Sequence, residues 1–213
     1  MSSVYLVLPV VLPILGGAVM PLLHLPEKQR NVFLEILILV TSVLAALCVL
    51  RRPKEGFILF HLTGNLDFAL RLDGLGSVFV CLVAFLWPLA TLYAFEYMRH
   101  EERTTSFFSF YTMTCGVTMG IAMAENLVTM YLFYELLTLV SVYLVMHPMT
   151  KKALHASRVY LYYSIGGAAF AFVALVFVII FGGTTDFVMG GVLDMSRVGD
   201  NITIVQIVYL LAF

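Results

Sequence analysis

The sequence predicts an all-α polytopic membrane protein with about six to seven transmembrane helices and one short β-hairpin. Of its 213 residues, 62% are hydrophobic and only 12% are charged, whereas a soluble domain exposes far more charge. The apolar residues also fall into runs of about 20, the length that an α-helix needs to cross a bilayer. The formal net charge of −1 comes without a basic stretch, which excludes a nucleic-acid partner.

Six apolar runs have the length of membrane spans. They cover residues 4–23, 32–50, 75–97, 107–124, 127–146 and 156–181. A seventh run starts at Ile202 and reaches Phe213. This run is too short to cross a bilayer, so we expect a partner subunit to complete the helix. We therefore expect residues 1–213 to form a single transmembrane domain that is incomplete and ends inside its seventh helix.

Between the second and third runs, residues 57–60 and 68–72 form two short apolar segments around Thr63, Gly64 and Asn65. A Gly-Asn turn between two such segments is typical of a β-hairpin. We expect this hairpin at the membrane surface, packed against neighbouring elements.

The basic residues of the short loops indicate an orientation. If the spans alternate, one side carries Lys28, Arg30, Arg99, Arg103, Lys151, Lys152 and Arg158. The other side carries Arg51, Arg52, Lys54, Arg71 and Arg197. Because basic residues favour the cytoplasmic side, we expect an integral protein of a prokaryotic cytoplasmic membrane with its N-terminus outside.

The first candidate site residue is Glu135, near the centre of a run that contains no other charge. A carboxyl at the membrane midplane costs about 2.5–3.5 kcal/mol, so it indicates ion or proton handling. On the same helix face, Tyr131 and Thr138 lie one turn away and offer hydroxyls that can bond the carboxyl or hold a water. The alternative is a carboxyl that is neutral or ion-paired and serves only helix packing.

Arg158 is the predicted partner of Glu135. By helical rise, Arg158 lies about 10 Å and Glu135 about 16 Å from the same side of the membrane, a difference that the Arg side chain or one water bridges. Arginine keeps its proton, so Arg158 would tune the carboxyl rather than relay a proton. The alternative is that Arg158 snorkels to the lipid headgroups.

Redox and hydrolytic signals are absent from the sequence. The five histidines lie at span ends or in loops, which argues against a b-type haem carrier. The sequence contains no dinucleotide-binding GxGxxG motif, no P-loop and no HExxH motif, and its three cysteines lack metal-binding spacing. We expect no cofactor and no metal in this chain, and no chemistry of its own.

Two stretches carry a resemblance to a known family. Residues 107–111 and residues 125–141, which include Glu135, resemble the antiporter-like subunits of respiratory complex I, which also occur in Mrp-type sodium/proton antiporters and membrane-bound energy-converting hydrogenases. Residues 72–75, which enter the third span after the hairpin, are similar to a second feature of that family. The resemblance follows the span order and implies the N-terminal half of a fold built from inverted repeats.

The resemblance also implies a role for Glu135. In that family the matching glutamate pairs with a lysine to switch proton access. This chain has Arg158 where the family often has a lysine, and it stops at Phe213, just before the position of the family's central lysine. A split gene, a truncated sequence and a half-subunit retained for assembly all fit, and each requires protein partners.

The expected function is that of a non-redox membrane subunit of a complex I-like or energy-converting hydrogenase-like complex. It would contribute Glu135, with Arg158, Thr138 and Tyr131, to proton or sodium translocation coupled to electron transfer. One alternative is a subunit of an Mrp-type sodium/proton antiporter, and another is a structural scaffold that conducts no ions. The expected partners are the lipid bilayer, other membrane subunits, including one that completes the seventh helix and the second half, and peripheral redox subunits.

Overall fold

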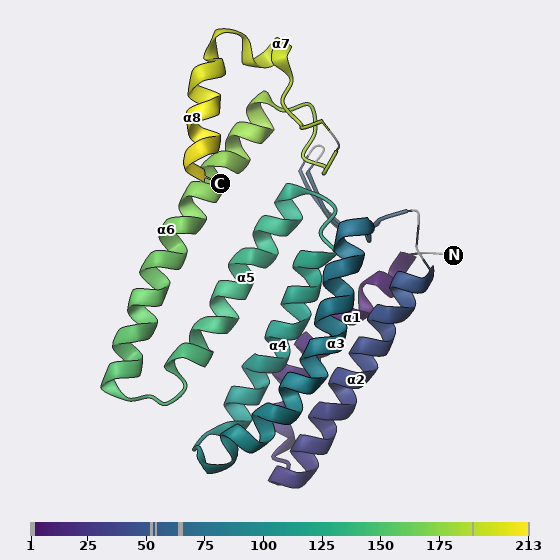
Figure 1. The fold of residues 1–213 in the computed structure, drawn as a ribbon, viewed down its shortest axis with the longest axis vertical. Helices are drawn as coiled ribbons and strands as arrows, with labels where there is room; N and C mark the ends of the chain where they lie inside the picture. The colour runs from purple at the N-terminus through teal and green to yellow at the C-terminus, as the bar shows by residue number, and fades with distance from the viewer. Residues whose placement is uncertain (1–2, 52, 54, 64–65, 189, 213) are drawn as a thin grey trace.

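The computed structural model describes residues 3–51, 53, 55–63, 66–188 and 190–212. Long helices run roughly parallel to one another and form the body of the molecule (Figure 1). They are α1 (Leu8–Val19), α2 (Glu27–Arg51), α3 (Gly74–Tyr97), α4 (Thr104–Ala122), α5 (Leu127–Met146) and α6 (Lys151–Phe181). These helices occupy the six predicted spans in order, so the predicted all-α membrane fold is confirmed.

Shorter segments complete the chain. The 3-10 turns are η1 (Ser3–Leu6), η2 (Met20–Leu23), η3 (Met98–His100) and η4 (Gly199–Asn201). In the C-terminal part, α7 (Met195–Val198) precedes α8 (Ile202–Ala212), which packs beside α6 (Figure 1). The predicted start of the seventh run at Ile202 is confirmed, whereas Phe213 lies outside the described residues.

Several helices begin before the apolar run that predicts them. Helix α2 starts at Glu27 rather than at residue 32, and α6 starts at Lys151 rather than at residue 156. The first turn of each helix is polar, and a search for apolar runs leaves polar residues out, so the predicted start falls too late. At the start of α6, the Thr150 side chain caps the helix by accepting a hydrogen bond from the Ala153 amide at 3.1 Å.

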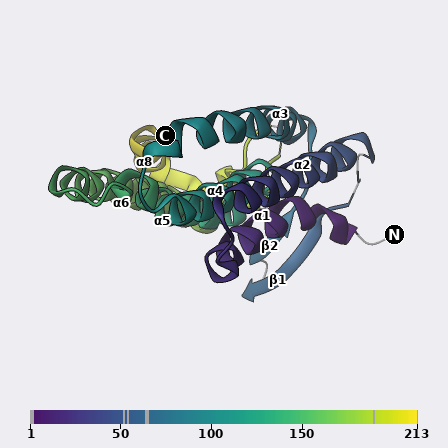
Figure 2. The same cartoon turned by 90° about the horizontal axis from the view of Figure 1, so that it is seen from below.

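Four helices are long and apolar enough to cross a membrane, judged by length and composition: α2, α3 with its η3 extension, α5 and α6. Residues 8–23 and α8 are shorter apolar helices. Helix α4 is rich in serine and threonine, and it packs against α1, α3 and α5. Viewed from below, it lies between α3 and α1 (Figure 2). Its polar character therefore fits a central helix with little surface for lipid.

Small residues bring α1 and α4 into backbone contact. A Cβ atom added to Gly116 would lie 2.4 Å from the Val10 carbonyl oxygen, and one added to Gly17 would lie 2.6 Å from the Ser109 carbonyl oxygen. At the same crossing, the Ser109 hydroxyl donates to the Gly17 carbonyl oxygen at 2.5 Å. Close packing and interhelical hydrogen bonds replace the hydrophobic effect as the force between membrane helices, so this crossing holds the first half of the bundle together.

The predicted hairpin is confirmed as β1 (Phe57–Thr63) paired antiparallel with β2 (Leu66–Leu70), although its Gly64–Asn65 turn lies outside the described residues. Phe57 lies opposite Leu70. Backbone hydrogen bonds join the hairpin to the link between α4 and α5, from the Arg71 amide to Met123 and from the Glu125 amide to Ala69. The hairpin is thereby attached to the start of α5.

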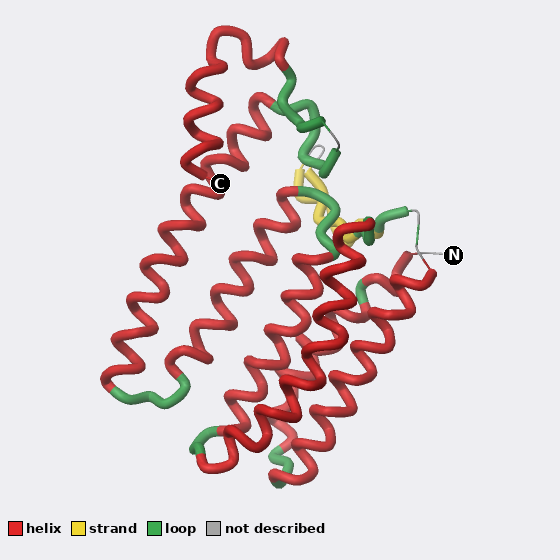
Figure 3. Tube along the Cα trace, viewed as in Figure 1, coloured by secondary structure: helices red, strands yellow, loops and turns green. Residues whose placement is uncertain are grey.

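The loops gather at the two ends of the bundle (Figure 3). The links α1–α2, α3–α4 and α5–α6 share one end, as alternating spans require. The basic residues predicted for one side lie in these links or in the helical turns next to them, except for Arg158, which lies about two turns into α6. On the other side, Arg52 and Lys54 lie outside the described residues.

Candidate functional site

Glu135 is half-buried on α5. Eight residues separate it from Leu127 and eleven from Met146, which places it about 12 Å and 16 Å from the two ends of the helix. Helix α5 contains no other charged residue. The carboxyl therefore lies in the middle third of a membrane-spanning helix.

Tyr131 lies one turn before Glu135 on α5. Its hydroxyl is close enough to the Glu135 carboxyl for the two to interact. The Tyr131 ring in turn packs against Phe172 of α6, with ring centroids 5.7 Å apart. Tyr131 thus lies where α5 meets α6.

Thr138 is buried, and its hydroxyl donates to the Tyr134 carbonyl oxygen at 3.4 Å rather than to Glu135. It begins a row of hydroxyls that crosses to α6. The Ser141 hydroxyl donates to the Thr138 carbonyl oxygen at 3.3 Å and lies 2.7 Å from the Tyr160 hydroxyl. Ser141 and Tyr160 are not among the site residues predicted from the sequence. The spacing of three residues already places Thr138 and Ser141 on one face of α5.

Arg158 is exposed on α6, seven residues after Lys151 and thus about 10 Å along the helix. Within the described residues, no ion pair joins it to Glu135. The structure therefore does not bring the predicted pair into direct contact. A water-mediated link between the two side chains stays a prediction.

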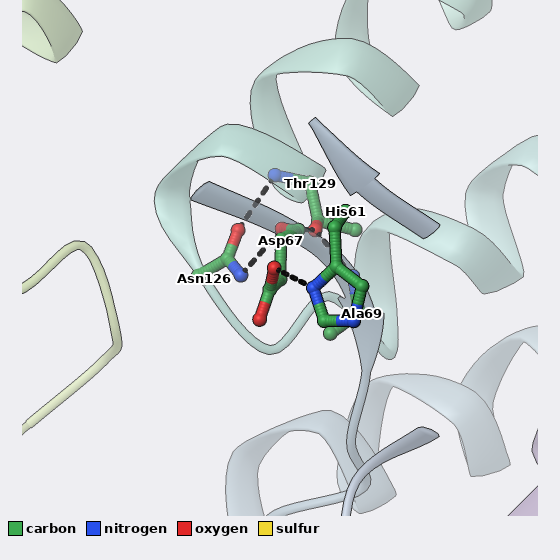
Figure 4. Close-up of polar contacts among 5 residues, drawn as sticks. All are labelled: His61, Asp67, Ala69, Asn126 and Thr129. Carbon is green, nitrogen blue, oxygen red and sulfur yellow. Dashed lines mark hydrogen bonds and ion pairs between the residues drawn. The ribbon is translucent and has the colours of Figure 1, made fainter. Parts of the chain in front are cut away.

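The N-terminus of α5 is anchored to the hairpin by Asn126 and Thr129 (Figure 4). The Asn126 side-chain oxygen accepts from the Thr129 amide at 2.8 Å and so caps the helix, while its Nδ2 donates to the Asp67 carbonyl oxygen at 2.9 Å. The Thr129 hydroxyl accepts from the Ala69 amide at 3.0 Å. These bonds fix the height of α5 against the hairpin, and with it the depth of Glu135. An asparagine before an apolar run is a recognisable cap, but its second bond is not readable from the sequence.

An acidic rim surrounds this anchor. Glu125 lies 3.8 Å from Arg71, and Asp67 lies 2.5 Å from the exposed His61. Burial raises the pKa of Glu125, Arg71 opposes that shift, and Asp186 and Asp67 add to it. Among the described residues, no group of three or more His, Cys, Asp or Glu side chains is arranged to hold a metal ion.

Known proteins share this sequence pattern and fold. Residues 60–108 match the family described as NADH-ubiquinone oxidoreductase (complex I), chain 5 N-terminus. The chain is 28% identical over 144 residues to Na(+)/H(+) antiporter subunit A1 of Staphylococcus haemolyticus (strain JCSC1435), which covers 68% of this chain and 16% of that protein.

Two solved structures have the same fold. The Mrp complex from Dietzia sp. DQ12-45-1b contains a chain with a TM-score of 0.78, 17% identity, and coverage of 97% of this chain and 23% of that one. The archaeal membrane-bound sulfane sulfur reductase contains another, with a TM-score of 0.74, 18% identity, and coverage of 97% of this chain and 43% of that one. This chain thus spans less than half the length of each of these relatives.

The family match covers the end of β1, β2, α3 and the first turns of α4, and the fold similarity extends over nearly the whole chain. The described part of the chain also contains four helices that are long and apolar enough to cross a membrane, judged by length and composition. The protein is an integral membrane protein that is similar in sequence and fold to the antiporter-like membrane subunits of complex I and of Mrp-type antiporters.

Proposed function

We propose that this subunit contributes Glu135 to the translocation of protons or sodium ions by a multisubunit membrane complex. The observation that carries the proposal is a half-buried carboxyl in the middle third of a membrane helix, without an ion-pair partner in the described part of the chain. A carboxyl locked in a static salt bridge would favour the scaffold alternative. A carboxyl that lies beside a neutral phenol remains able to exchange a proton or bind a cation.

The neighbouring groups have distinct roles in this proposal. Tyr131 orients the carboxyl, and the hydroxyls of Thr138, Ser141 and Tyr160 provide polar contacts for water between α5 and α6. Arg158 keeps its positive charge and acts through water on the stability of the carboxylate. A proton or sodium ion then alternates with Arg158 as the group that balances the charge of Glu135.

Two driving forces fit this proposal equally well. The family description names complex I and one similar structure is an archaeal respiratory complex, which favours transport coupled to electron transfer, with peripheral redox subunits as partners. The relative from Staphylococcus haemolyticus is a Na(+)/H(+) antiporter subunit, which favours transport driven by an ion gradient. In both cases other membrane subunits complete the path, and the N-terminus faces outward across a prokaryotic cytoplasmic membrane.

The test is ion transport by the whole complex in liposomes that contain a pH-sensitive dye, with Glu135→Gln as the variant. This change keeps the side-chain shape and removes the titratable charge, so we expect transport to be lost while the complex stays assembled. Glu96→Gln is the matched control, because Glu96 lies at the end of α3 and its side chain is 77% exposed. Unchanged transport in Glu135→Gln would leave the scaffold alternative. Adding an electron donor or a sodium gradient in turn identifies the driving force.

A further inference from the structure

A second carboxyl lies inside the bundle, on α2. Glu35 follows Glu27 by eight residues, which places it about 12 Å from the N-terminal end of its helix. It is half-buried, and its Oε2 atom is fully buried. Glu35 is therefore at a depth similar to that of Glu135, but in the other half of the molecule.

Two further buried polar atoms face the same region from neighbouring helices. The indole nitrogen of Trp87 on α3 and the hydroxyl of Tyr111 on α4 have no hydrogen-bond partner among the described residues, and neither has Oε2 of Glu35. The rings of Trp87 and Tyr111 lie 5.4 Å apart, and the Tyr111 hydroxyl is close enough to Glu35 for the two to interact electrostatically. Helices α2, α3 and α4 thus place buried polar atoms without a hydrogen-bond partner around Tyr111.

The nearby polar side chains do not satisfy these atoms. Thr91 lies beside the Tyr111 hydroxyl without reaching hydrogen-bond geometry, and its own hydroxyl donates to the Trp87 carbonyl oxygen at 2.8 Å. Arg30, the nearest cation on α2, donates to Thr104 at 2.6 Å. Within the described residues, no ion pair reaches Glu35.

The other helices around Glu35 bring few ionisable groups. Helix α1 carries none, and α4 adds Cys115 to Tyr111. On α3, Glu96 lies at the C-terminal end of the helix, nine residues after Trp87, and is paired with Arg99. Buried polar atoms without a partner cost free energy, and native proteins satisfy nearly all of them with protein groups or ordered water.

We propose that Glu35, Trp87 and Tyr111 form a hydrated site that binds and releases a proton, here called the α2–α4 site. The Trp87 N–H donates to a water, the Tyr111 hydroxyl donates or accepts, and the Glu35 carboxylate accepts, which gives a water the two to four partners that it needs. The carboxylate takes a proton from a hydronium ion and leaves a neutral water. The carboxylic acid returns that proton to water when the site empties.

The α2–α4 site rests on the packing of α2, α3 and α4 and not on the role proposed for Glu135. Helix α4 lies between it and α5 (Figure 2). A subunit with both sites would hold two exchangeable protons in its membrane domain, one between α5 and α6 and one within the first half of the bundle.

Trp87 is the single tryptophan of the chain, so its fluorescence reports directly on this site. The experiment is a pH titration of the tryptophan emission of the full chain in lipid nanodiscs, in H2O and in D2O. We expect one pH transition in the emission, together with a higher quantum yield in D2O, because water contacts the indole N–H. Glu35→Gln removes the transition, and Tyr111→Phe, which keeps the ring packing, shifts its midpoint.

Two controls separate this site from other carboxyls. Glu96→Gln removes a surface carboxyl and Glu135→Gln removes the α5 carboxyl, and both are expected to leave the transition unchanged. Emission that is flat with pH in the unmodified chain, or a transition that persists in Glu35→Gln, would overturn the proposal. So would a midpoint unmoved by Tyr111→Phe together with equal emission in H2O and D2O. None of these results depends on whether Glu135 transports ions.

Discussion

The two halves of the molecule are built differently, although each contains a membrane carboxyl. In the first half, α1, α3 and α5 surround α4, and glycines bring α1 and α4 into backbone contact. In the second half, α6 is largely exposed, with Tyr162 and Tyr163 among its exposed residues. Glu35 is enclosed by three helices, whereas Glu135 lies on the more open face between α5 and α6. The first half is thus the more closely packed one, and the second half exposes more surface that lipid or a partner subunit can cover.

The largest expected effect on stability comes from a substitution that disrupts the α1–α4 contact in the first half of the molecule. In Gly116→Val the new side chain meets the Val10 carbonyl oxygen, because a Cβ at this position would lie 2.4 Å from it. We expect the free energy of unfolding to fall by about 3 kcal/mol, measured by unfolding in a denaturing detergent. The control is Gly166→Ala on α6, where nothing lies within 4 Å of an added Cβ. It should change stability by about 1 kcal/mol or less. Equal effects at the two positions would mean that the halves are packed alike.

The next effect tests the joint between the hairpin and α5. Asn126→Ala removes both the cap on Thr129 and the bond to Asp67, and we expect it to cost about 2 kcal/mol in the same unfolding assay. Asn126→Ser keeps an acceptor for the cap but lacks the amide donor, so we expect about half of that loss. If the serine variant matched the unmodified chain, the bond to the hairpin would contribute nothing to the position of α5.

The smallest effect concerns His147, where α5 ends beside the start of α4. Its side chain is buried, its ring lies 5.2 Å from that of Phe107, and neither ring nitrogen has a hydrogen-bond partner among the described residues. Burial lowers the pKa of His147, Glu101 opposes the shift, and Arg103 adds to it. The backbone of Glu102 also opposes the shift but does not reach hydrogen-bond geometry.

A lowered pKa sets the direction of the pH dependence. The unfolded chain takes up the proton first, so the stability from neutral His147 is complete above about pH 6.5 and is lost as pH falls through the folded pKa. The thermal unfolding midpoint should therefore fall with acidification, and by less in His147→Phe than in the unmodified chain. His155→Phe, at an exposed position on α6, is the control and should leave the pH dependence unchanged.

The sequence predicts the spans, the hairpin and the family because these depend on long apolar runs and local turn residues. It also singles out Glu135, since one charge in an uncharged run of 20 residues is conspicuous. Glu35 is less conspicuous in the sequence because it lies only a few residues after the charged first turn of α2. The structure shows that Glu35 is half-buried with a fully buried Oε2 atom, so the rule that selects Glu135 also selects Glu35.

Other features depend on contacts between distant residues. The central position of α4 and its contact with α1 through Gly17 and Gly116 require knowledge of which helices meet. The same holds for the bond from Asn126 to Asp67, 59 residues apart. For Arg158, helical rise gives its depth but not the direction of its side chain, and the expected contact with Glu135 is not a direct one.

The most direct test of the role proposed for Glu135 is infrared difference spectroscopy of the whole complex, comparing the resting and the energised state. The signal is the carbonyl stretch of a protonated carboxylic acid, assigned by its loss in Glu135→Gln and by its shift in D2O. We predict that this band changes on energisation, because Glu135 gains or loses a proton while the complex works. A Glu135 band that is identical in both states would contradict the account, because a carboxyl that never changes its protonation or environment cannot take part in ion transport.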